Sequence, residues 1–259
     1  MIDYVAMAEM IRGWVEEAGD ILRESLADNS IKVEEKTNPS DLVTEMDRFI
    51  EKFYVQKIQE HFPDHKILGE EGTYDTFEDL KGFIWVIDPI DGTLNYVKQK
   101  RNFCSMLAVF NDGEPVLSFI NDVIHEELYE GVKGHGVRCN GHLMEPIAEH
   151  PISEGLVSIN TRMEMRDPER ARSIVGDSLG VRLMGSSGLE MVQVISNRIS
   201  AYVTTPLSFW DVAPGMVMAA ELGLKMTRPD GEPIKLLENN PIIIANPMAY
   251  EQIIGKFSN

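Results

Sequence analysis

The chain has 259 residues, 43% of them hydrophobic and 25% charged, which is an ordinary globular composition and enough for one large domain or two joined halves. Its 42 acidic residues against 24 basic ones give a formal net charge of -18, which argues against direct binding to nucleic acid. The two cysteines, Cys104 and Cys139, belong to no CxxC or Cys/His pattern, so we expect neither disulfides nor a zinc site. No apolar run reaches the about 20 residues needed to cross a bilayer, so we expect a cytoplasmic protein without a membrane span.

Two amphipathic helices are predicted at the start of the chain. Apolar residues recur at helical spacing between residues 2 and 27, and acidic residues interrupt them, so this segment predicts a helix and not a signal peptide. A short strand is expected at 31–35 and a turn-rich loop at 37–41 (TNPSD). A second helix is expected from about Thr44 to Phe62, because Pro63 ends the helical pattern.

Strands are predicted after the second helix. The pair Ile67-Leu68 and the continuous apolar run FIWVI at 83–87 are typical of buried strands. Strand-like segments between 104 and 139 flank an Asp112-Gly113 pair and precede an Asn140-Gly141 pair, two dipeptides typical of tight hairpins. The first part of the chain therefore predicts two helices on a largely antiparallel sheet.

The second part of the chain alternates strands with helices. Strands are expected at 156–160, 181–184, 201–205 and 241–245, and helices at 168–177, 187–195 and 211–222. This alternation predicts an α/β layer. We therefore predict two halves in one tightly packed body, residues 1–150 and residues 151–259, with the boundary near 145–155.

The most informative segment is WVIDPIDGTLNY at 85–96. A buried strand is expected to end at Asp88 and to turn through a proline, so that Asp88 and Asp91 face one point beyond the strand. The helix start expected after Gly92 offers free amides and Thr93 adds a hydroxyl, a set that suits a phosphate bound together with Mg²⁺. The alternative is that Asp91 is a turn residue and Asp88 a helix cap.

Two further acidic segments follow predicted strands. GEEG at 69–72 carries Glu70, which is either solvated or recruited to a site. WDVAPG at 210–215 places Asp211 at a helix start, with Pro214 expected in the first turn. Asp211 either caps that helix or reaches the same site as the other acids.

The segment DLVTEMD at 41–47 is the fourth acidic piece. Thr44 and Asp47 resemble a capping box in which Asp replaces the usual Glu. The functional alternative puts Asp47 near Thr93, as the partner that orients a water molecule.

Together the four segments resemble the inositol monophosphatase family. DLVTEMD, GEEG, WVIDPIDGTLN and WDVAPG stand in the order in which that family carries DxVTxxD, GEE, WxIDPIDGTxN and WDxAAG, and the resemblance covers nearly the whole chain. It implies a layered αβαβα sandwich of the inositol monophosphatase/fructose-1,6-bisphosphatase type, which combines an α+β half with an α/β half. It also implies a homodimer and inhibition by lithium.

The resemblance further implies the site. The expected ligands of two or three Mg²⁺ ions are four carboxylates and one backbone carbonyl, those of Glu70, Asp88, Ile90, Asp91 and Asp211. Thr93, paired with Asp47, is expected to orient and deprotonate the attacking water, with Glu70 as the third catalytic residue. The amides of Gly92 and Thr93 are expected to hold the phosphate.

The residues expected to recognise the substrate depart in part from the family pattern. Seven residues before the aspartate of the WD motif, members that favour inositol phosphates carry a glutamate, whereas this chain has Thr204. The loop usually close to GSAAL reads GSSGLE at 185–190. The substrate-binding residues expected by resemblance are Gly92, Thr93, Gly185, Ser186, Ser187, Thr204 and Asp211.

We therefore predict Mg²⁺-dependent hydrolysis of a small phosphate monoester, with inositol monophosphate as substrate and relaxed specificity. The alternatives within the same chemistry are NADP 2'-phosphatase and fructose-1,6-bisphosphatase activity. An alternative of another class is a regulatory binding protein in a transcription complex for ribosomal RNA. A metal-dependent nuclease would need a basic groove, and the sequence contains no run of Lys and Arg to build one.

Overall fold

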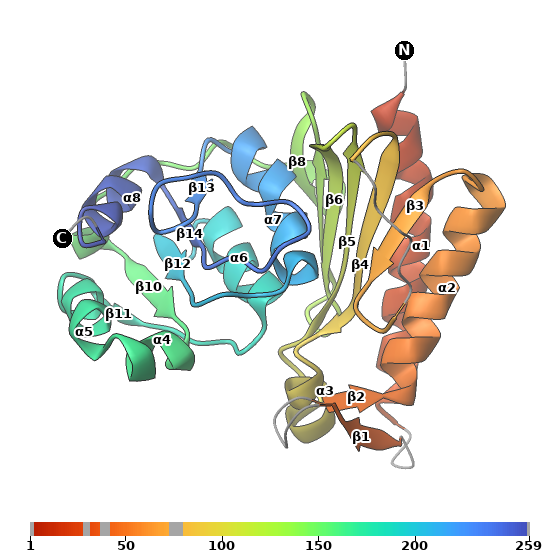
Figure 1. Ribbon diagram of the computed structural model, residues 1–259, viewed down its shortest axis with the longest axis horizontal. Helices are drawn as coiled ribbons and strands as arrows, with labels where there is room; N and C mark the ends of the chain where they lie inside the picture. Colours follow the sequence, from red (N-terminus) through yellow and green to blue (C-terminus); the bar gives the residue numbers. More distant parts are fainter. Residues whose placement is uncertain (1–2, 28–31, 37–41, 73–79, 258–259) are drawn as a thin grey trace.

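Five layers of secondary structure stack side by side along the long axis of the molecule (Figure 1). The computed structural model describes residues 3–27, 32–36, 42–72 and 80–257. Helices α1 (Tyr4–Ser25) and α2 (Glu45–His61) form one outer layer. Helices α6 (Ser187–Ile195) and α7 (Phe209–Glu221) lie between the two sheets. The opposite outer layer consists of α4 (Thr161–Arg166), α5 (Pro168–Gly176) and α8 (Pro247–Ile254). The predicted αβαβα sandwich is confirmed.

A seven-stranded sheet forms the second layer and follows the order of the chain. Its strands are β3 (Lys66–Gly69), β4 (Phe83–Asp91), β5 (Cys104–Asn111), β6 (Glu114–Asp122), β7 (Glu127–Val132), β8 (Gly136–Cys139) and β9 (His142–Leu143). Only β3 and β4 pair in parallel within this sheet, so the prediction of a largely antiparallel sheet is confirmed. Asp112-Gly113 and Asn140-Gly141 form the expected hairpin turns, with positive φ at all four residues.

A five-stranded sheet forms the fourth layer. Its order is β11 (Gly180–Val181), β10 (Leu156–Ile159), β12 (Ala201–Val203), β14 (Ile243–Ala245) and β13 (Lys225–Thr227). β10 runs parallel to both of its neighbours, whereas β14 is antiparallel to β12 and β13. The expected strand at 181–184 is shorter and earlier than predicted, and α4 was not predicted because only six residues form it.

The remaining elements are short. They are β1 (Val33–Glu35), which pairs with β2 (Leu42–Thr44), α3 (Thr93–Gln99) and a 3₁₀ turn (Ile152–Glu154). The loop expected at 37–41 lies outside the described residues. Among the helices of the described residues, none has the length and apolar character needed to span a bilayer.

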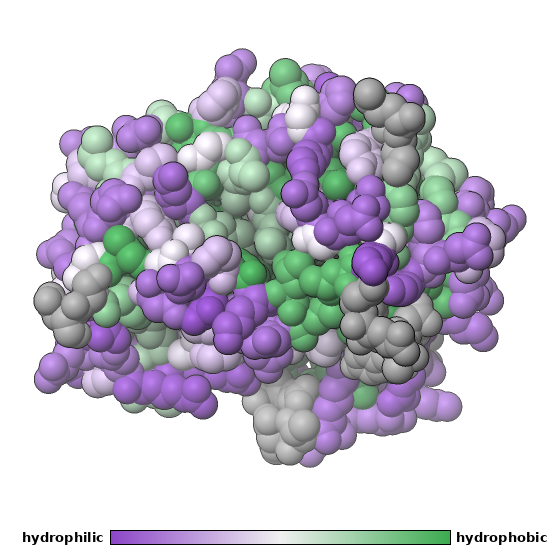
Figure 2. Space-filling view, turned by 45° about the horizontal axis from the view of Figure 1, so that its top comes forward, coloured by the Kyte–Doolittle hydropathy of each residue, from purple (hydrophilic) through white to green (hydrophobic). Residues whose placement is uncertain are grey.

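The apolar run of β4 is explained by burial on both faces of the sheet. Trp85 and Ile87 pack with α1 and α2, whereas Ile84 and Val86 point to the other face and pack with the layer of α6 and α7. A strand covered on both sides loses the alternation of apolar and polar residues, and its apolar side chains contribute to the hydrophobic burial that drives folding. Figure 2 shows a mostly hydrophilic surface on the face it draws, with apolar residues gathered in the middle.

Helix α7 packs tightly against the seven-stranded sheet at Gly131 of β7. A Cβ at this position would lie 2.8 Å from Ser118 Oγ, 2.9 Å from Met218 Cγ and 3.3 Å from the Met218 backbone nitrogen. Because the helix backbone cannot yield, a larger residue would separate α7 from the sheet and shift the helix start, which carries Asp211.

We expect Gly131→Ala to lower the free energy of unfolding by about 1–3 kcal/mol through overpacking. The matched control is Gly13→Ala in α1, where a Cβ would meet nothing within 4 Å. That change should stabilise the protein by about 0.5–1 kcal/mol, because alanine is the better helix former. Urea unfolding of both variants tests this, and equal effects would contradict the close approach of α7.

Candidate active site

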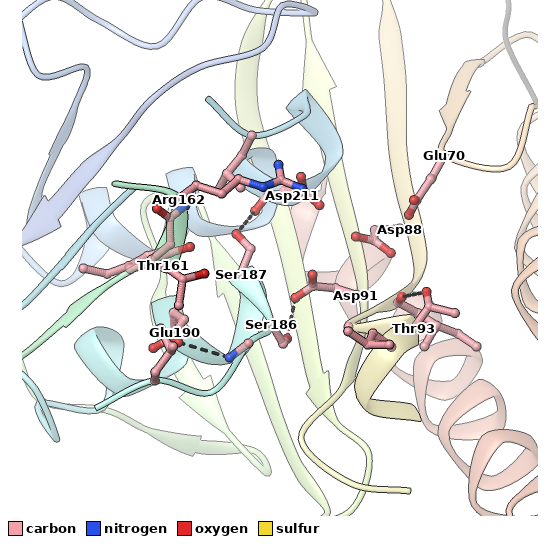
Figure 3. A pocket seen from close by; sticks show the side chains of 18 of the residues that line it. Glu70, Asp88, Asp91, Thr93, Thr161, Arg162, Ser186, Ser187, Glu190 and Asp211 are labelled. Atoms are coloured by element: carbon pink, nitrogen blue, oxygen red, sulfur yellow. Dashed lines mark hydrogen bonds between the residues drawn. The ribbon is translucent and has the colours of Figure 1, made fainter. Parts of the chain in front are cut away.

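Most of the expected site residues line one pocket of about 440 Å³, whereas Asp47 and Thr204 do not (Figure 3). One part of its lining comes from the ends of β3 and β4 and from the start of α3. The other part comes from the segment after β10 and from the starts of α6 and α7. The polar residues that line the pocket are Glu70, Asp88, Asp91, Thr93, Asn160, Thr161, Arg162, Ser186, Ser187, Glu190, Tyr202 and Asp211.

A bulge in β4 brings Asp88 and Asp91 to the same place. Asp88 pairs with Met106 and Asp91 with Cys104, so three steps along β4 correspond to two along β5. In a regular strand, residues three apart point to opposite faces, and the extra residue cancels that alternation. The expectation that the strand ends at Asp88 is therefore wrong: β4 continues to Asp91, and its proline lies in the bulge, where no ladder amide is required.

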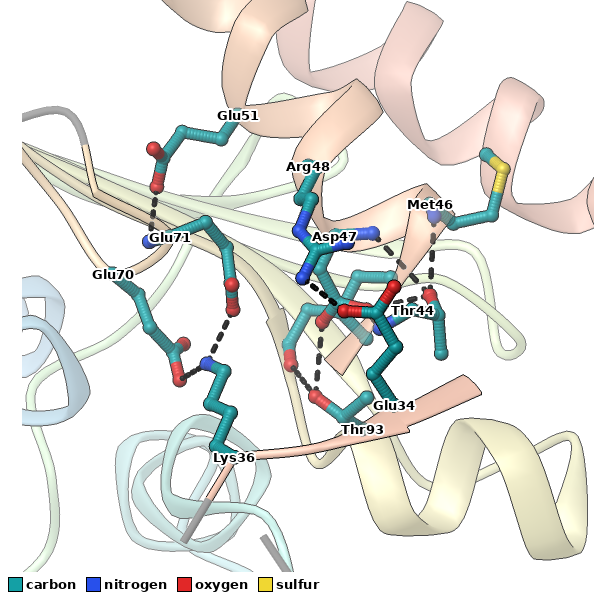
Figure 4. Close-up of polar contacts among 11 residues, drawn as sticks. Glu34, Lys36, Thr44, Met46, Asp47, Arg48, Glu51, Glu70, Glu71 and Thr93 are labelled. Atoms are coloured by element: carbon teal, nitrogen blue, oxygen red, sulfur yellow. Dashed lines mark hydrogen bonds and ion pairs between the residues drawn. The ribbon is translucent and has the colours of Figure 1, made fainter. Parts of the chain in front are cut away.

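Glu70 reaches the same place from the neighbouring strand. Because β3 and β4 are parallel, their carboxyl ends lie at one edge of the sheet, and the Glu70 amide still donates to Ile87 O at 3.1 Å. The Glu70 carboxylate accepts a hydrogen bond from Lys36 Nζ at 2.9 Å, and the same ammonium lies 2.5 Å from Glu71 Oε1 (Figure 4). The Glu70 carboxylate thus belongs to a charged cluster with Lys36 and Glu71, which agrees with the second of the two readings of GEEG.

Asp211 serves both of the purposes between which the sequence left a choice. It is the third residue of α7, and its Oδ2 accepts the Ser208 amide at 3.0 Å in a capping box. Its carboxylate also lines the pocket. Pro214 lies in the second turn of α7 and not in the first, which corrects the prediction.

Asp88, Asp91 and Asp211 form a group able to hold a cation. One carboxylate oxygen from each lies within 4.8 Å of the others. Neither oxygen of the buried Asp88 has a hydrogen-bond donor among the described residues; the nearby Glu70 and Asp211 carboxyls could donate only when protonated. Burial, followed by repulsion from neighbouring carboxylates, raises the pKa of Asp88 and Asp211 well above the usual range. A hard divalent cation fits such an all-oxygen donor set.

The start of α6 fixes the orientation of Asp91. Its Oδ2 accepts hydrogen bonds from Ser186 Oγ at 2.5 Å and from the Gly188 amide at 2.6 Å. Glycine is required at 188, because a Cβ there would lie 2.4 Å from Met106 Sδ and 2.5 Å from Cys104 Sγ. Packing against β5 therefore explains this departure from the family loop.

Thr93 lies beside a fixed carboxylate. Its Oγ1 is 3.0 Å from both Asp47 Oδ1 and Ile90 O, so its single hydrogen can be donated to either oxygen. The other oxygen of Asp47 accepts the Thr44 amide at 2.7 Å and the Thr44 hydroxyl at 2.6 Å (Figure 4). The predicted capping box and the predicted proximity to Thr93 are both confirmed. Burial raises the pKa of Asp47 to about 6.

Gly92 allows the turn that starts α3 next to these acids. Its φ of 92° lies in the left-handed region, and a Cβ would lie 3.1 Å from Ser186 Cβ. Within the described residues, no side chain caps the start of α3. The expected helix start at this position is confirmed.

The expected substrate-binding residues separate into two groups. Gly185, Ser186 and Ser187 line the pocket, whereas Thr204 does not. Thr204 is buried, and its hydroxyl bonds to Asn160 Nδ2 and to Thr205 O. Asn160, the hydrogen-bond partner of Thr204, does line the pocket.

Asn160, Arg162, Glu190 and Glu51 are residues that the sequence analysis did not identify. Asn160 follows β10 at the carboxyl end of the strand, which is a position where ligands bind in α/β sheets. Glu190 Oε1 accepts the Met184 amide at 2.5 Å and so holds the segment before α6. Glu51 of α2 is 3% exposed, and its Oε2 accepts the Glu71 amide at 2.7 Å (Figure 4).

Known proteins resemble the chain over nearly its whole length. The inositol monophosphatase family model matches residues 3–259. The inositol-1-monophosphatase of Bacillus subtilis is 38% identical, with 99% of this chain and 98% of that protein covered. The fructose-1,6-bisphosphatase/inositol-1-monophosphatase of Thermotoga maritima is 30% identical, with 86% and 84% covered.

Solved structures are also similar to the chain over nearly its whole length. An IMPase/NADP phosphatase complexed with Mg²⁺ and phosphate has a TM-score of 0.92 and 30% identity, covering 98% of this chain and 95% of that one. Staphylococcal inositol monophosphatase-1, soaked in 100 mM LiCl, has a TM-score of 0.93 and 30% identity, covering 99% and 96%.

We expect chelator-treated protein to become more stable as the pH falls from about 7 to about 5. The folded-state pKa values of Asp47, Asp88, Asp91 and Asp211 are raised, so the folded protein binds more protons than the unfolded chain, and stability falls as pH rises. Thermal melts across this range test the expectation.

Two comparisons isolate the cause. Burial lowers the pKa of His65, so protonation of this histidine in the unfolded chain lowers stability as the pH falls below about 6.5. Asp88→Asn should therefore weaken the gain in stability at low pH and leave the effect of His65 unchanged. Excess Mg²⁺ should also weaken it. A melting temperature that falls steadily from pH 7 to 5 in chelator would contradict the repulsion between carboxylates.

Proposed function

The chain belongs to the inositol monophosphatase family, a family of phosphomonoesterases, and we propose that it hydrolyses small phosphate monoesters in a Mg²⁺-dependent reaction, with inositol monophosphate as substrate and relaxed specificity. The observation that carries the proposal is a pocket lined both by a group of three carboxylates and by Thr93, whose hydroxyl is hydrogen-bonded to Asp47. The inositol-1-monophosphatase of Bacillus subtilis supports the choice of substrate.

The metal positions follow from the carboxylates at the ends of the strands. The groups that would hold two ions are Glu70, Asp88 and the Ile90 carbonyl for the first, and Asp88, Asp91 and Asp211 for the second. A weaker third position would use Glu70 with Asp47. Bound Mg²⁺ supplies positive charge that stabilises the attacking and the leaving oxygen of the phosphate.

Thr93 and Asp47 would orient the attacking water and remove its proton. When the Thr93 hydroxyl donates to Asp47 Oδ1, its lone pairs are free to accept a hydrogen bond from water. The proton of the water can then move to Thr93 Oγ1 as the threonine proton moves to Asp47. A pKa of about 6 makes Asp47 a better proton acceptor than an ordinary aspartate, and its bonds to Thr44 hold it still.

The phosphate and the leaving group would occupy opposite parts of the pocket. The amides of Gly92 and Thr93 at the start of α3 are placed to hold the phosphate. Asp211, Gly185, Ser186 and Ser187 would contact the leaving group. Position 204 carries a threonine, which is buried and bonded to Asn160, so the hydroxyl groups of an inositol ring have no carboxylate partner there, which favours relaxed specificity.

Two alternatives within the same chemistry remain as proposals. The Thermotoga maritima relative is named for fructose-1,6-bisphosphatase as well as inositol-1-monophosphatase activity, and a similar solved structure is an IMPase/NADP phosphatase. We also propose that the chain acts as a homodimer in the cytoplasm, is inhibited by lithium, and divides into halves at residues 1–150 and 151–259.

The first test is phosphate release from inositol 1-phosphate, fructose 1,6-bisphosphate and NADP, with and without Mg²⁺. Asp88→Asn should abolish the Mg²⁺-dependent turnover, and Thr93→Val should lower kcat by about 10²–10⁴-fold, the usual contribution of general base catalysis. Asp20→Asn, an exposed acid in an ion pair with Arg23, is the control and should change little. Unchanged kcat in Thr93→Val would rule out the proposed proton transfer.

Glu51 offers a second test, because it holds the segment that carries Glu70. Glu51→Ala should weaken Mg²⁺ binding by about 10–100-fold, as loss of a partner that orients a metal ligand usually does. Glu51→Gln, which keeps an acceptor for the Glu71 amide, should retain most of the affinity, and Glu60→Ala on the exposed side of α2 should be neutral. Calorimetric titration with Mg²⁺ measures this; equal affinities in the Ala and Gln variants would contradict it.

A further inference from the structure

The first turn of helix α6 contacts two aspartates that belong to different elements of the fold. Ser186 caps the start of α6 and donates to Asp91 Oδ2 at 2.5 Å, and the Gly188 amide donates to the same oxygen at 2.6 Å. Ser187 lies between them, and its hydroxyl donates to the backbone carbonyl of Asp211 at 2.9 Å. Figure 3 shows Ser186 directed toward Asp91 and Ser187 directed toward Asp211.

The hydrogen bond between Ser187 and Asp211 has a defined direction. A carbonyl oxygen carries no hydrogen, so the Ser187 hydroxyl is the donor and its single hydrogen is committed to this bond. Ser187 is 7% exposed, so little water can compete for that hydrogen. Because Asp211 is the third residue of α7, the bond ties the start of α7 to the start of α6.

Asp91 and Asp211 are otherwise held by different parts of the fold. Ser208 donates its amide to Asp211 Oδ2, which orients this carboxylate within α7 but not relative to Asp91. Asp91 is held by the bulge of β4 and by the start of α6. The separation of the two carboxylates therefore depends on how the start of α7 is held against α6.

A metal ion shared by these carboxylates is sensitive to that separation. One oxygen from each of Asp88, Asp91 and Asp211 lies within 4.8 Å of the others. Mg²⁺ requires a nearly ideal octahedral arrangement with bonds of about 2.0–2.1 Å, so a small displacement of one ligand weakens binding. Contacts that orient the ligands of a metal therefore contribute to its affinity.

Ser187 is also a departure from the family pattern. GSAAL carries alanine at the position of Ser187, and alanine has no hydroxyl to donate. Packing against β5 explains the glycine at 188 but not a hydroxyl at 187. The contact with Asp211 is therefore a feature of the loop of this chain and not of the family pattern.

We propose that Ser187 is a positioning residue for the second Mg²⁺ position. Its hydroxyl holds the start of α7 at a fixed place relative to Asp91 and so sets the separation of the Asp91 and Asp211 carboxylates. This rests on the metal positions given with the proposed function and adds to them a residue that is not itself a ligand.

Calorimetric titration of chelator-treated protein with Mg²⁺ tests this in wild type, Ser187→Ala, Asp211→Asn and Ser196→Ala. Asp211→Asn identifies the binding event of the second position, because that event should be lost. Ser196→Ala is the matched control: the Ser196 hydroxyl donates to Val192 O at 2.7 Å at the other end of α6, outside the pocket.

Ser187→Ala should weaken the second binding event by about 3–10-fold, the effect of losing one neutral hydrogen bond, and leave the first event unchanged. Glu51→Ala should do the reverse, because Glu51 holds the segment that carries Glu70. Ser196→Ala should change neither event. Equal weakening of both events in Ser187→Ala, or an unchanged second event, would show that Ser187 does not set the second position.

Hydrolysis of inositol 1-phosphate over a range of Mg²⁺ concentrations separates positioning from contact with the substrate. Saturating Mg²⁺ should return kcat/KM of Ser187→Ala close to the wild-type value. If KM for the ester stays raised at saturating Mg²⁺ while the Mg²⁺ affinity is unchanged, the hydroxyl serves the leaving group and the proposal is wrong.

The two measurements also distinguish this proposal from the proposed reaction. If no ester is hydrolysed but Ser187→Ala still weakens the second binding event selectively, the hydrolytic function fails and the role of Ser187 stands. If the ester is hydrolysed and Ser187→Ala binds Mg²⁺ as wild type does, the hydrolytic function stands and the role of Ser187 fails.

Discussion

Carboxylate groups that converge at low dielectric repel one another, and much of this structure serves to hold them together despite that repulsion. The bulge in β4 aims Asp88 and Asp91 at one point, and the parallel pairing of β3 with β4 delivers Glu70 to the same edge. The amide of Ser208 and the start of α6 fix Asp211 and Asp91 with hydrogen bonds. These hydrogen bonds orient the carboxylates but do not neutralise them, so the arrangement suits a divalent cation.

Hydrogen bonds at the site join segments that lie far apart in the chain. Asn95 of α3 donates to the carbonyls of Asn102, Met184 and Gly185, and so ties α3 to the segment before α6. Ser186, before α6, donates to Asp91 of β4. The placement of the acids relative to the loop at the start of α6 therefore depends on these contacts, so a substitution in one segment is expected to disturb the other.

The sequence predicted those parts of the site that depend on local patterns. The Thr44–Asp47 capping box, the helix start after Gly92 and the hairpin dipeptides each have a signature within four residues, and the structure has all three. The bulge in β4 has no such signature, because it is defined by register against β5.

The other site features that the sequence did not predict also depend on contacts between segments far apart in the chain. Glu51 and Asn160 act through partners 20 or more residues away in the chain, so only the fold brings them to the site. Gly188 looked like a change in the substrate loop, and the structure shows that it makes room for Met106 and Cys104. Thr204 occupies the sequence position of a substrate contact, but it is buried, is bonded to Asn160 and does not line the pocket.

The capping box of α2 has a consequence for the motions of the site. Asp47 caps the amino-terminal end of α2: one of its carboxylate oxygens accepts the Thr44 amide, and the other accepts a hydrogen bond from Thr93. Helix termini fray readily, and here fraying would withdraw the partner of Thr93 in the same event. The opening of one helical turn and the loss of the competent arrangement are therefore a single fluctuation, so amide hydrogen exchange at Met46 and Asp47 would report how often the site is assembled.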